Sequence, residues 1–400
     1  MYKESVSVLS IAHVRVAASL LTAVFLATTV CAQESVENEP ARIYNTEANT
    51  TRFRVEAVAT GLEIPWAMAF APDGRLFVTE RPGRLRVLVN GVLQAKPLAE
   101  FPEVKNARET GLMGLALHPR FAQNRWLYVA YAYQAKERYV RVERFRETGD
   151  SLVERKTIIE DIPAANYHAG CRIKFGPDRK LYITTGDATA GIYAQRLDSL
   201  HGKTLRVNED GTIPGDNPFT GITGVRAEIF SYGHRNSQGM DWQPWTGRLF
   251  QTEHGPTSIL DGIDFLYANG GGDEINVVES GKNYGWPIIH HERRRSFMET
   301  PLLEYTPAIA PAGAVFYRGT AFPQFQGNFF FANLKDQSLI RVVLNGSRVV
   351  SQERLLRREF GRLRDITVGP DGALYFCTSN RDPYGKSSVN DDRILRIVPA

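Results

Sequence analysis

The segment NYHAGCRIKFGPDRKLYITTGDA, residues 166–188, places several reactive side chains in one short loop. His168 offers a titratable imidazole, Cys171 a thiol and Arg172 a guanidinium, and loops held by a rigid sheet are where catalytic side chains concentrate. The second half predicts a Pro-Asp turn followed by a half-buried strand that begins at Leu181. Two interpretations of His168 stay open here, a working base or a turn residue at the start of a strand.

A second candidate is the segment TEHGP, residues 252–256. His254 has no second histidine at the spacing of a helical zinc motif, and the segment predicts a strand end, which argues against zinc. The carbonyls of Gly255 and Pro256 suit a hard cation such as calcium, which binds carbonyl oxygens readily. A plain loop exit is the alternative.

Acidic residues open the segment GGDEINVVESGKNYGWP, residues 271–287. Asp273 and Glu274 precede a predicted strand, and Tyr284 follows in a loop bounded by glycines. A carboxylate and loop carbonyls could surround a structural calcium there, and a solvated acidic turn is the alternative.

Several cationic side chains stand near predicted strand ends. Arg235 and Asn236 could hold a planar carboxylate or tie loops together. Lys335 follows an aromatic strand, while Arg362 and Arg364 lie two apart on one face of a strand, where they repel each other unless an anion lies between them. A bound polyanion supplies that anion, and so would Asp365 with its acidic neighbours.

The elements that must position these residues follow a repeating pattern. The segments AFAPDGRLFVTE, KFGPDRKLYITTG and TVGPDGALYFCTS each combine a strand end, a Pro turn and a strand with alternating apolar residues. LALHPRFAQNRWLYVAY, DWQPWTGRLFQTE and the pair AVFYRG and NFFFANLKDQSLIRVVLNG fit the same scheme, at spacings of roughly 45 to 75 residues. The pattern predicts an all-β six-bladed propeller of four-stranded antiparallel blades, whose long loops form the site, in preference to a β-sandwich pair.

Composition limits the function classes. The 400 residues are 43% hydrophobic and 23% charged, which is typical of a globular protein, and the net charge of +4 with mixed signs argues against nucleic-acid binding. Cys171 and Cys377 remain after the N-terminal segment, either as a disulfide or as two buried thiols.

The N-terminus predicts export. Arg15, an apolar run and small residues ending at Ala32 match a signal peptide over 1–32, with lipidation at Cys31 or an uncleaved anchor as alternatives. Residues 33–51 then form a polar, flexible leader, and the propeller covers 52–400. We therefore expect a periplasmic or secreted protein without stable membrane insertion after cleavage.

Taken together, the motifs resemble the glucose/sorbosone dehydrogenase family, the soluble aldose sugar dehydrogenases that use pyrroloquinoline quinone (PQQ). The resemblance runs in order from about Gly61 to Pro399. It is carried by GLEIPWAMAFAPDG, ETGLMGLALHPRF, HAGCRI, LHGKTLRVNEDGTIPGDNPF, SYGHRNSQGM, EHGP, GGDEINVVESGKNYGWP, LKDQ and RLRD.

The resemblance implies roles for matching positions. His168 corresponds to the catalytic base that takes the proton of the anomeric hydroxyl while a hydride passes from C1 to the quinone, and Asp187 to the carboxylate that orients it. The carbonyls of Gly255 and Pro256 match ligands of the calcium at the quinone, and Glu274 and Tyr284 match a structural calcium site. The positions that match cofactor-binding residues are Arg235, Asn236, Lys335, Arg362 and Arg364, together with Glu109.

Glu109 departs from the family pattern, because the glucose-specific branch has glutamine there. The chain also lacks a clear counterpart of the loops that restrict sugar choice in that branch, so it is more similar to the broad-specificity enzymes. The expected partners are an aldose and an electron acceptor whose identity the sequence does not give. A calcium-dependent sugar lactonase and a non-catalytic propeller binding module are the alternatives.

Overall fold

The computed structural model describes residues 42–400 except 48–49, 257–269 and 292. The predicted signal peptide, 1–32, and the first part of the predicted leader lie outside these residues, so the account below concerns the compact unit Glu39–Ala400. Within the described residues, no helix has both the length and the apolar character needed to cross a membrane.

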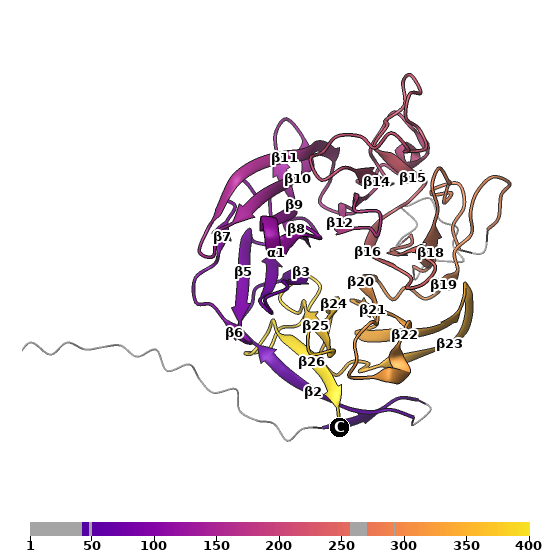
Figure 1. The fold of residues 1–400 in the computed structure, drawn as a ribbon. Coiled ribbons are helices and arrows are strands. Elements are labelled where there is room, and N and C mark those ends of the chain that lie inside the picture. The colour runs from indigo at the N-terminus through magenta and orange to yellow at the C-terminus, as the bar shows by residue number, and fades with distance from the viewer. Residues whose placement is uncertain (1–41, 48–49, 257–269, 292) are drawn as a thin grey trace, which may run out of the picture. The chain divides into compact units, whose positions relative to one another are not determined.

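The strands of the described residues form six antiparallel sheets around a common centre, which confirms the predicted six-bladed β-propeller (Figure 1). Blade 1 contains β3 (Pro65–Phe70), β4 (Leu76–Glu80), β5 (Arg84–Val89), β6 (Val92–Leu93) and β7 (Ala99–Glu100). Blade 2 contains β8 (Leu112–Leu117), β9 (Trp126–Gln134), β10 (Arg138–Glu147) and β11 (Leu152–Pro163). Blade 3 contains β12 (Gly170–Phe175), β13 (Leu181–Thr185), β14 (Lys203–Val207) and β15 (Ile229–Tyr232).

The second half of the chain repeats this order. Blade 4 contains β16 (Ser237–Trp242), β17 (Leu249–Glu253), β18 (Asp273–Val278) and β19 (Leu303–Tyr305). Blade 5 contains β20 (Pro311–Phe316), β21 (Phe329–Asn333), β22 (Ser338–Asn345) and β23 (Arg348–Leu355). Blade 6 contains β24 (Leu363–Val368), β25 (Leu374–Thr378), β26 (Ile394–Pro399), β2 (Arg52–Ala59) and β1 (Ile43–Asn45). The described helices are short: α1 (Phe121–Asn124) and the 3₁₀ helices Gly191–Gln195 and Pro323–Phe325.

Blade 6 closes the ring with both ends of the domain. Strand β26 pairs with β25 on one side and with β2 on the other, so the last strand of the chain lies beside one of the first (Figure 1). Strand β1, which pairs with β2, lies inside the range 33–51 that the sequence predicted as a flexible leader. Its three residues add an edge to an existing sheet, and an edge strand this short carries little sequence pattern.

The repeated Pro turns join the first and second strands of blades. In three of these turns an aspartate side chain accepts a hydrogen bond from the backbone N–H of the residue two positions later. The accepting residues are Asp73, Asp178 and Asp371, and the distances are 3.2, 3.0 and 3.1 Å. This local hydrogen bond stabilises the turn without help from the rest of the fold. It explains why the repeat is visible in the sequence.

The second strands are more buried than predicted. All five residues of β13 are buried, so the prediction of a half-buried strand was wrong. In three blades a threonine of the second strand contacts the neighbouring blade: Thr79, Thr184 and Thr252 donate to main-chain oxygens of the next blade's first strand at 2.6, 2.9 and 2.7 Å. These threonines, which look like solvent-facing positions of an alternating strand, instead form buried hydrogen bonds between blades.

Strand direction determines where the functional residues meet. In an antiparallel blade, the loop between the second and third strands and the loop leading into the next blade emerge at the same end. The loops of the first kind carry Asp187, Gly255 and Lys335, and those of the second kind carry Glu109, His168, Arg235 and Arg362. Residues far apart in the sequence are thus brought to one end of the propeller.

Candidate active site

His168 and Asp187 form a hydrogen-bonded pair at this end. Nδ1 of His168 lies 2.8 Å from Oδ1 of Asp187, joining the loop before β12 to the loop after β13. The approach needs a glycine, because a Cβ at Gly186 would lie 1.7 Å from the carbonyl oxygen of His168. With Nδ1 directed at the carboxylate, Nε2 is the ring nitrogen that can accept a proton.

Asp187 is 1% exposed and is held by donors on both oxygens. The backbone N–H of Thr189 donates to Oδ1 at 2.8 Å, and the indole N–H of Trp286 donates to Oδ2 at 2.8 Å. Burial alone would raise the pKa of this carboxyl, but the hydrogen bond and charge of His168, with Arg235 and the Thr189 amide, lower it below its usual range. Asp187 therefore stays ionised and can stabilise an imidazolium.

Glu109 reaches this pair from the loop between blades 1 and 2. Its Oε2 accepts the backbone N–H of His168 at 3.0 Å, and His168 itself adopts a left-handed backbone with φ of 56°. Glu109, predicted from the resemblance to contact the cofactor, thus holds the main chain of His168 in the structure. The hydrogen bond helps to fix a conformation that is uncommon for residues other than glycine.

Arg235 and Asn236 lie between blades 3 and 4 next to the pair. Arg235 is 2% exposed, donates from Nη1 to the carbonyl of His254 at 3.2 Å, and places its guanidinium carbon 5.4 Å from the centre of the Trp286 ring. Asn236 accepts the N–H of Gly170 at 3.1 Å through Oδ1. This last contact joins the arginine loop to the strand that follows His168.

Arg362 and Arg364 stand where blade 6 begins. Arg362 pairs with Asp382 at 2.9 Å and Arg364 donates to Gln238 at 2.9 Å. Burial lowers the pKa of Arg364 to about 10, with the charge of Arg362 acting in the same direction. Asp365 does not neutralise this pair, because it forms an ion pair with Arg172 at 3.0 Å.

Lys335 lies next to the residue that Arg362 contacts in blade 5. It is exposed, in the turn between β21 and β22, and its backbone N–H donates to the carbonyl of Ile309 at 3.0 Å. The neighbouring carbonyl of Leu334 accepts from Arg362 at 3.3 Å. The structure therefore brings Lys335 close to the arginine pair, as a common cationic site would require.

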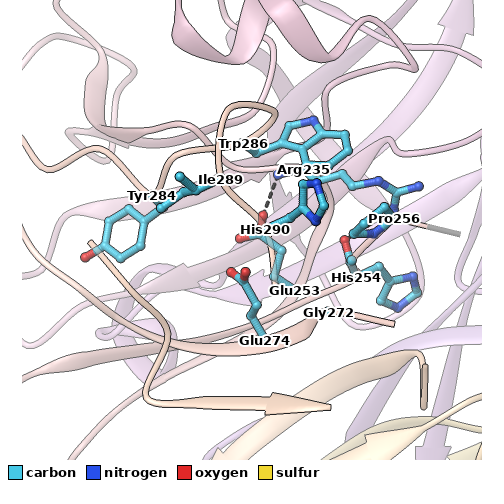
Figure 2. Close-up of a pocket in the computed structure, with 11 residues that line it drawn as sticks. Arg235, Glu253, His254, Pro256, Gly272, Glu274, Tyr284, Trp286, Ile289 and His290 are labelled. Carbon is cyan, nitrogen blue, oxygen red and sulfur yellow. Dashed lines mark hydrogen bonds between the residues drawn. The ribbon is translucent and has the colours of Figure 1, made fainter. Parts of the chain in front are cut away.

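The four predicted metal-ligating residues line one cavity, shown in Figure 2. Gly255, Pro256, Glu274 and Tyr284 surround a volume of about 10 Å³ together with Glu253 and other residues. This is room for about one water molecule or one ion. Asp273 supports the loop from beneath, since its carboxylate accepts the N–H groups of Gly255 at 2.8 Å and of Ile309 and Ala310 at 2.6 and 2.7 Å.

The carboxylates at this cavity differ in their partners. Glu253 accepts from His234 at 2.8 Å and from Ser237 at 3.0 Å. Glu274 accepts from Asn276 at 2.9 Å, and burial and the nearby charge of Glu253 raise its pKa well above the usual range. A bound cation would favour the ionised form of Glu274 and so lower its pKa again.

Tyr284 cannot contribute its hydroxyl to this cavity. The hydroxyl donates to the carbonyl of Val277 at 2.6 Å and accepts the N–H of Glu279 at 2.9 Å, and it points away from Glu274 (Figure 2). As a cation ligand, Tyr284 would therefore contribute its main-chain carbonyl oxygen. In the described residues no group of three or more His, Cys, Asp or Glu side chains is placed to hold a metal, so a cation here would depend on carbonyl oxygens.

The donor set fits the two groups implied by the resemblance. Among the described residues, Nε of Arg364, Nδ2 of Asn236 and Nε2 of His254 are buried donors or acceptors without a hydrogen-bond partner. Such atoms are rare in proteins unless a ligand or water completes them. The carboxylates of PQQ suit the donors, and hard carbonyl and carboxylate oxygens suit calcium.

Three features of the site were not predicted from the sequence. Trp286, which contacts Asp187, comes from the loop between the third and fourth strands of blade 4, which starts at the opposite end of the propeller. Asp382 forms an ion pair with Arg362, and Glu253 accepts a hydrogen bond from His234, 20 and 19 residues away along the chain. The WP pair at 286–287 was the one available signal for the tryptophan, and by itself it indicates only a loop.

Cys171 and Cys377 are free and buried, so these two form separate thiols rather than a disulfide. Burial raises the pKa of both thiols, so neither is poised to react. Cys171 donates to the carbonyl of Ala169 at 3.2 Å beneath the His168 loop, in agreement with a packing role.

Comparison with known proteins finds a family model and several relatives that match most of this chain. The family model for glucose / sorbosone dehydrogenase matches residues 62–385. An aldose sugar dehydrogenase of Escherichia coli, YliI, is 33% identical over 374 residues, which cover 88% of this chain and 95% of the relative. Quinoprotein glucose dehydrogenase B of Acinetobacter calcoaceticus is 30% identical over 308 residues, covering 69% of this chain and 60% of that protein.

A solved structure extends this similarity to three dimensions. The PQQ-bound form of the aldose sugar dehydrogenase from Streptomyces coelicolor superposes with a TM-score of 0.75. It is 30% identical, and the match covers 90% of this chain and 99% of that one.

Proposed function

This chain belongs to the glucose/sorbosone dehydrogenase family and is an enzyme of the quinoprotein aldose sugar dehydrogenase type, and on this premise we propose that it oxidises the anomeric carbon of aldoses to the lactone with PQQ and calcium. The single observation that carries the proposal is the His168–Asp187 pair, 2.8 Å apart, at the end of the propeller that also carries Arg235, Arg362 and Arg364. A base beside an anion-binding site suits a sugar oxidation that uses a carboxylated cofactor.

In the proposed mechanism His168 is the base. Nε2 takes the proton of the anomeric hydroxyl, and Asp187 holds the Nδ1–H tautomer and stabilises the imidazolium that forms. When bound, PQQ would supply a quinone as the acceptor for the hydride of C1, and calcium would supply a Lewis acid. Loss of this proton and hydride converts the hemiacetal to the lactone.

Other residues bind and orient. We assign the carboxylates of PQQ to the side chains of Arg235, Asn236, Lys335, Arg362 and Arg364. The carbonyls of Gly255 and Pro256 would hold the calcium at the quinone. The carboxylate of Glu274 and the main-chain carbonyl of Tyr284 would hold the structural calcium. The unpartnered buried Nε of Arg364 supports the assignment of PQQ, and the raised pKa of Glu274 supports the assignment of calcium.

Two alternative functions account for less of the site. A calcium-dependent lactonase requires a metal and a water but no polyanion site, which leaves the three arginines without a role. A binding module does not require a base, so it leaves the orientation of His168 by Asp187 without a purpose. We also propose that the protein works in the periplasm or outside the cell, on the evidence of the apolar N-terminal segment.

The test is dye-linked aldose oxidation by purified, cofactor-free protein with neither addition, with PQQ alone, with calcium alone and with both. We expect activity over a panel of aldoses only when both are present. Activity with calcium alone on lactones would support the lactonase. No oxidation of any aldose, together with no PQQ binding in a titration, would contradict the proposal.

A further inference from the structure

We propose that Trp286 is a positioning residue for the base, acting through its indole N–H on Asp187 and so on the protonation of His168; its catalytic consequence rests on the proposed function. The N–H donates to Oδ2 of Asp187 at 2.8 Å, while His168 binds the other oxygen at 2.8 Å. Trp286 is 6% exposed and Asp187 is 1% exposed, so water has little access to the contact.

The fold holds this tryptophan from several sides. Its segment leaves β18 at the far end of blade 4 and returns beside β15, where Asn283 forms a parallel bridge with Tyr232. The backbone N–H of Trp286 then donates to the carbonyl of Gly233 at 2.9 Å, and its carbonyl accepts from Gln195 at 2.7 Å. The indole is therefore delivered to Asp187 by a segment tied to blade 3 rather than by a loose loop.

Gly191 supplies the space for the indole. A Cβ at this position would lie 2.9 Å from Nε1 of Trp286 and 3.3 Å from Cε2. Both Gly191 and Gln195 belong to the 3₁₀ helix that follows Asp187 in blade 3. The loop that carries Asp187 thus also provides the space in which the Trp286 indole packs.

The indole N–H opposes protonation of the pair. Its positive end faces the carboxylate, so it partly offsets the negative charge that attracts a proton to His168. Removing the N–H leaves that charge less compensated, so the carboxylate should hold the imidazolium of His168 more strongly. The other titratable or charged groups facing the pair are Glu109, His201, Arg235 and His254, from four different loops, and the substitution leaves all of them in place.

The first test is Trp286→Phe in the full chain. Phenylalanine keeps an aromatic ring beside Arg235, whose guanidinium carbon lies 5.4 Å from the indole, but has no N–H. With PQQ and calcium bound, we expect kcat to fall about tenfold, the effect of losing one hydrogen bond to a charged group, and the acid limb of kcat/KM to move to higher pH. The Kd for PQQ should stay within about twofold. Trp245→Phe is the matched control, because Trp245 is 83% exposed.

The second test does not need the reaction. NMR titration of the His168 imidazole in cofactor-free protein, assigned with a His168→Asn variant, should give a higher pKa in Trp286→Phe than in the parent or in Trp245→Phe. Gly191→Ala, which displaces the indole without removing its N–H, should shift the pKa in the same direction.

The two proposals fail in different ways. If the parent oxidises no aldose, the proposed function is wrong, and the His168 titration still decides whether Trp286 acts on the pair. If Trp286→Phe folds with the stability of the control and leaves both the acid limb and the His168 pKa unchanged, Trp286 has only a packing role and the inference is overturned.

Discussion

The base and the cofactor side of this site are built differently. Around His168 and Asp187 the carboxylate has three donors, from His168, Thr189 and Trp286, at 2.8 Å each. On the cofactor side, Nε of Arg364 and Nδ2 of Asn236 are buried without a partner in the described residues, and Glu274 has a raised pKa. The protein completes the first region by itself and leaves the second to be completed by ligands.

The difference corresponds to two functions, which are orienting the base and binding the cofactor. A base must be oriented before the substrate arrives, because a misplaced imidazole loses rate steeply. A cofactor site can instead keep unsatisfied donors, since binding recovers the free energy that their burial costs. Variants of the two regions should therefore change different quantities.

The largest effect should come from removing the base. His168→Ala is expected to lower kcat by about 10² to 10⁴-fold, because no other group takes the proton. The affinity for PQQ should be almost unchanged, since the cationic residues are untouched. Steady-state kinetics and a PQQ titration of the same preparation measure both quantities. A parent-like kcat would remove His168 from the mechanism.

An intermediate effect should come from the cofactor side. Arg364→Ala is expected to weaken PQQ binding by about 10- to 100-fold, the range for a hydrogen bond to a charged group. At saturating PQQ, kcat should recover most of its value, in contrast to His168→Ala. Fluorescence titration gives the Kd, and Arg348→Ala, on an outer strand, is the control. Equal affinity in variant and parent would show that Arg364 serves the fold.

The smallest effect concerns stability and pH. The folded pKa of Glu274 is raised, so below its ordinary pKa of 4.5 its contribution favours the folded state, and the contribution is lost as pH rises through the folded pKa. Each unit of raised pKa corresponds to about 1.4 kcal/mol. Without calcium, the parent should therefore lose stability relative to Glu274→Gln as pH rises above 4.5.

Chemical unfolding at a series of pH values measures this difference. Saturating calcium should remove it in the parent, because the ion stabilises the ionised carboxylate. Glu160→Gln, at an exposed position, serves as the matched control. The same pH dependence in parent and Glu274→Gln would contradict the assignment of Glu274 to the cation cavity.

The sequence predicted the local parts of the fold well. The Pro-Asp turns are stabilised by contacts such as Asp178 with the N–H two residues on, and contacts of this range leave a visible pattern. The burial of β13 on both faces was not predictable from alternation, because the covering residues belong to neighbouring blades. The short strand β1 was missed for a related reason, since its order comes from pairing with β2.

The site shows the same division. The sequence alone determined the residue types available for chemistry, the repeated hairpins and, through its ordered motifs, the family. Only the tertiary structure decided that the hydroxyl of Tyr284 turns away from the cavity, that Asp365 pairs with Arg172, and that Trp286 reaches Asp187 from another blade. The physical reason is distance along the chain: Asp187 and Trp286 are partners because blades 3 and 4 are neighbours and the loop after β18 returns to blade 3, and no local pattern encodes a contact of that kind.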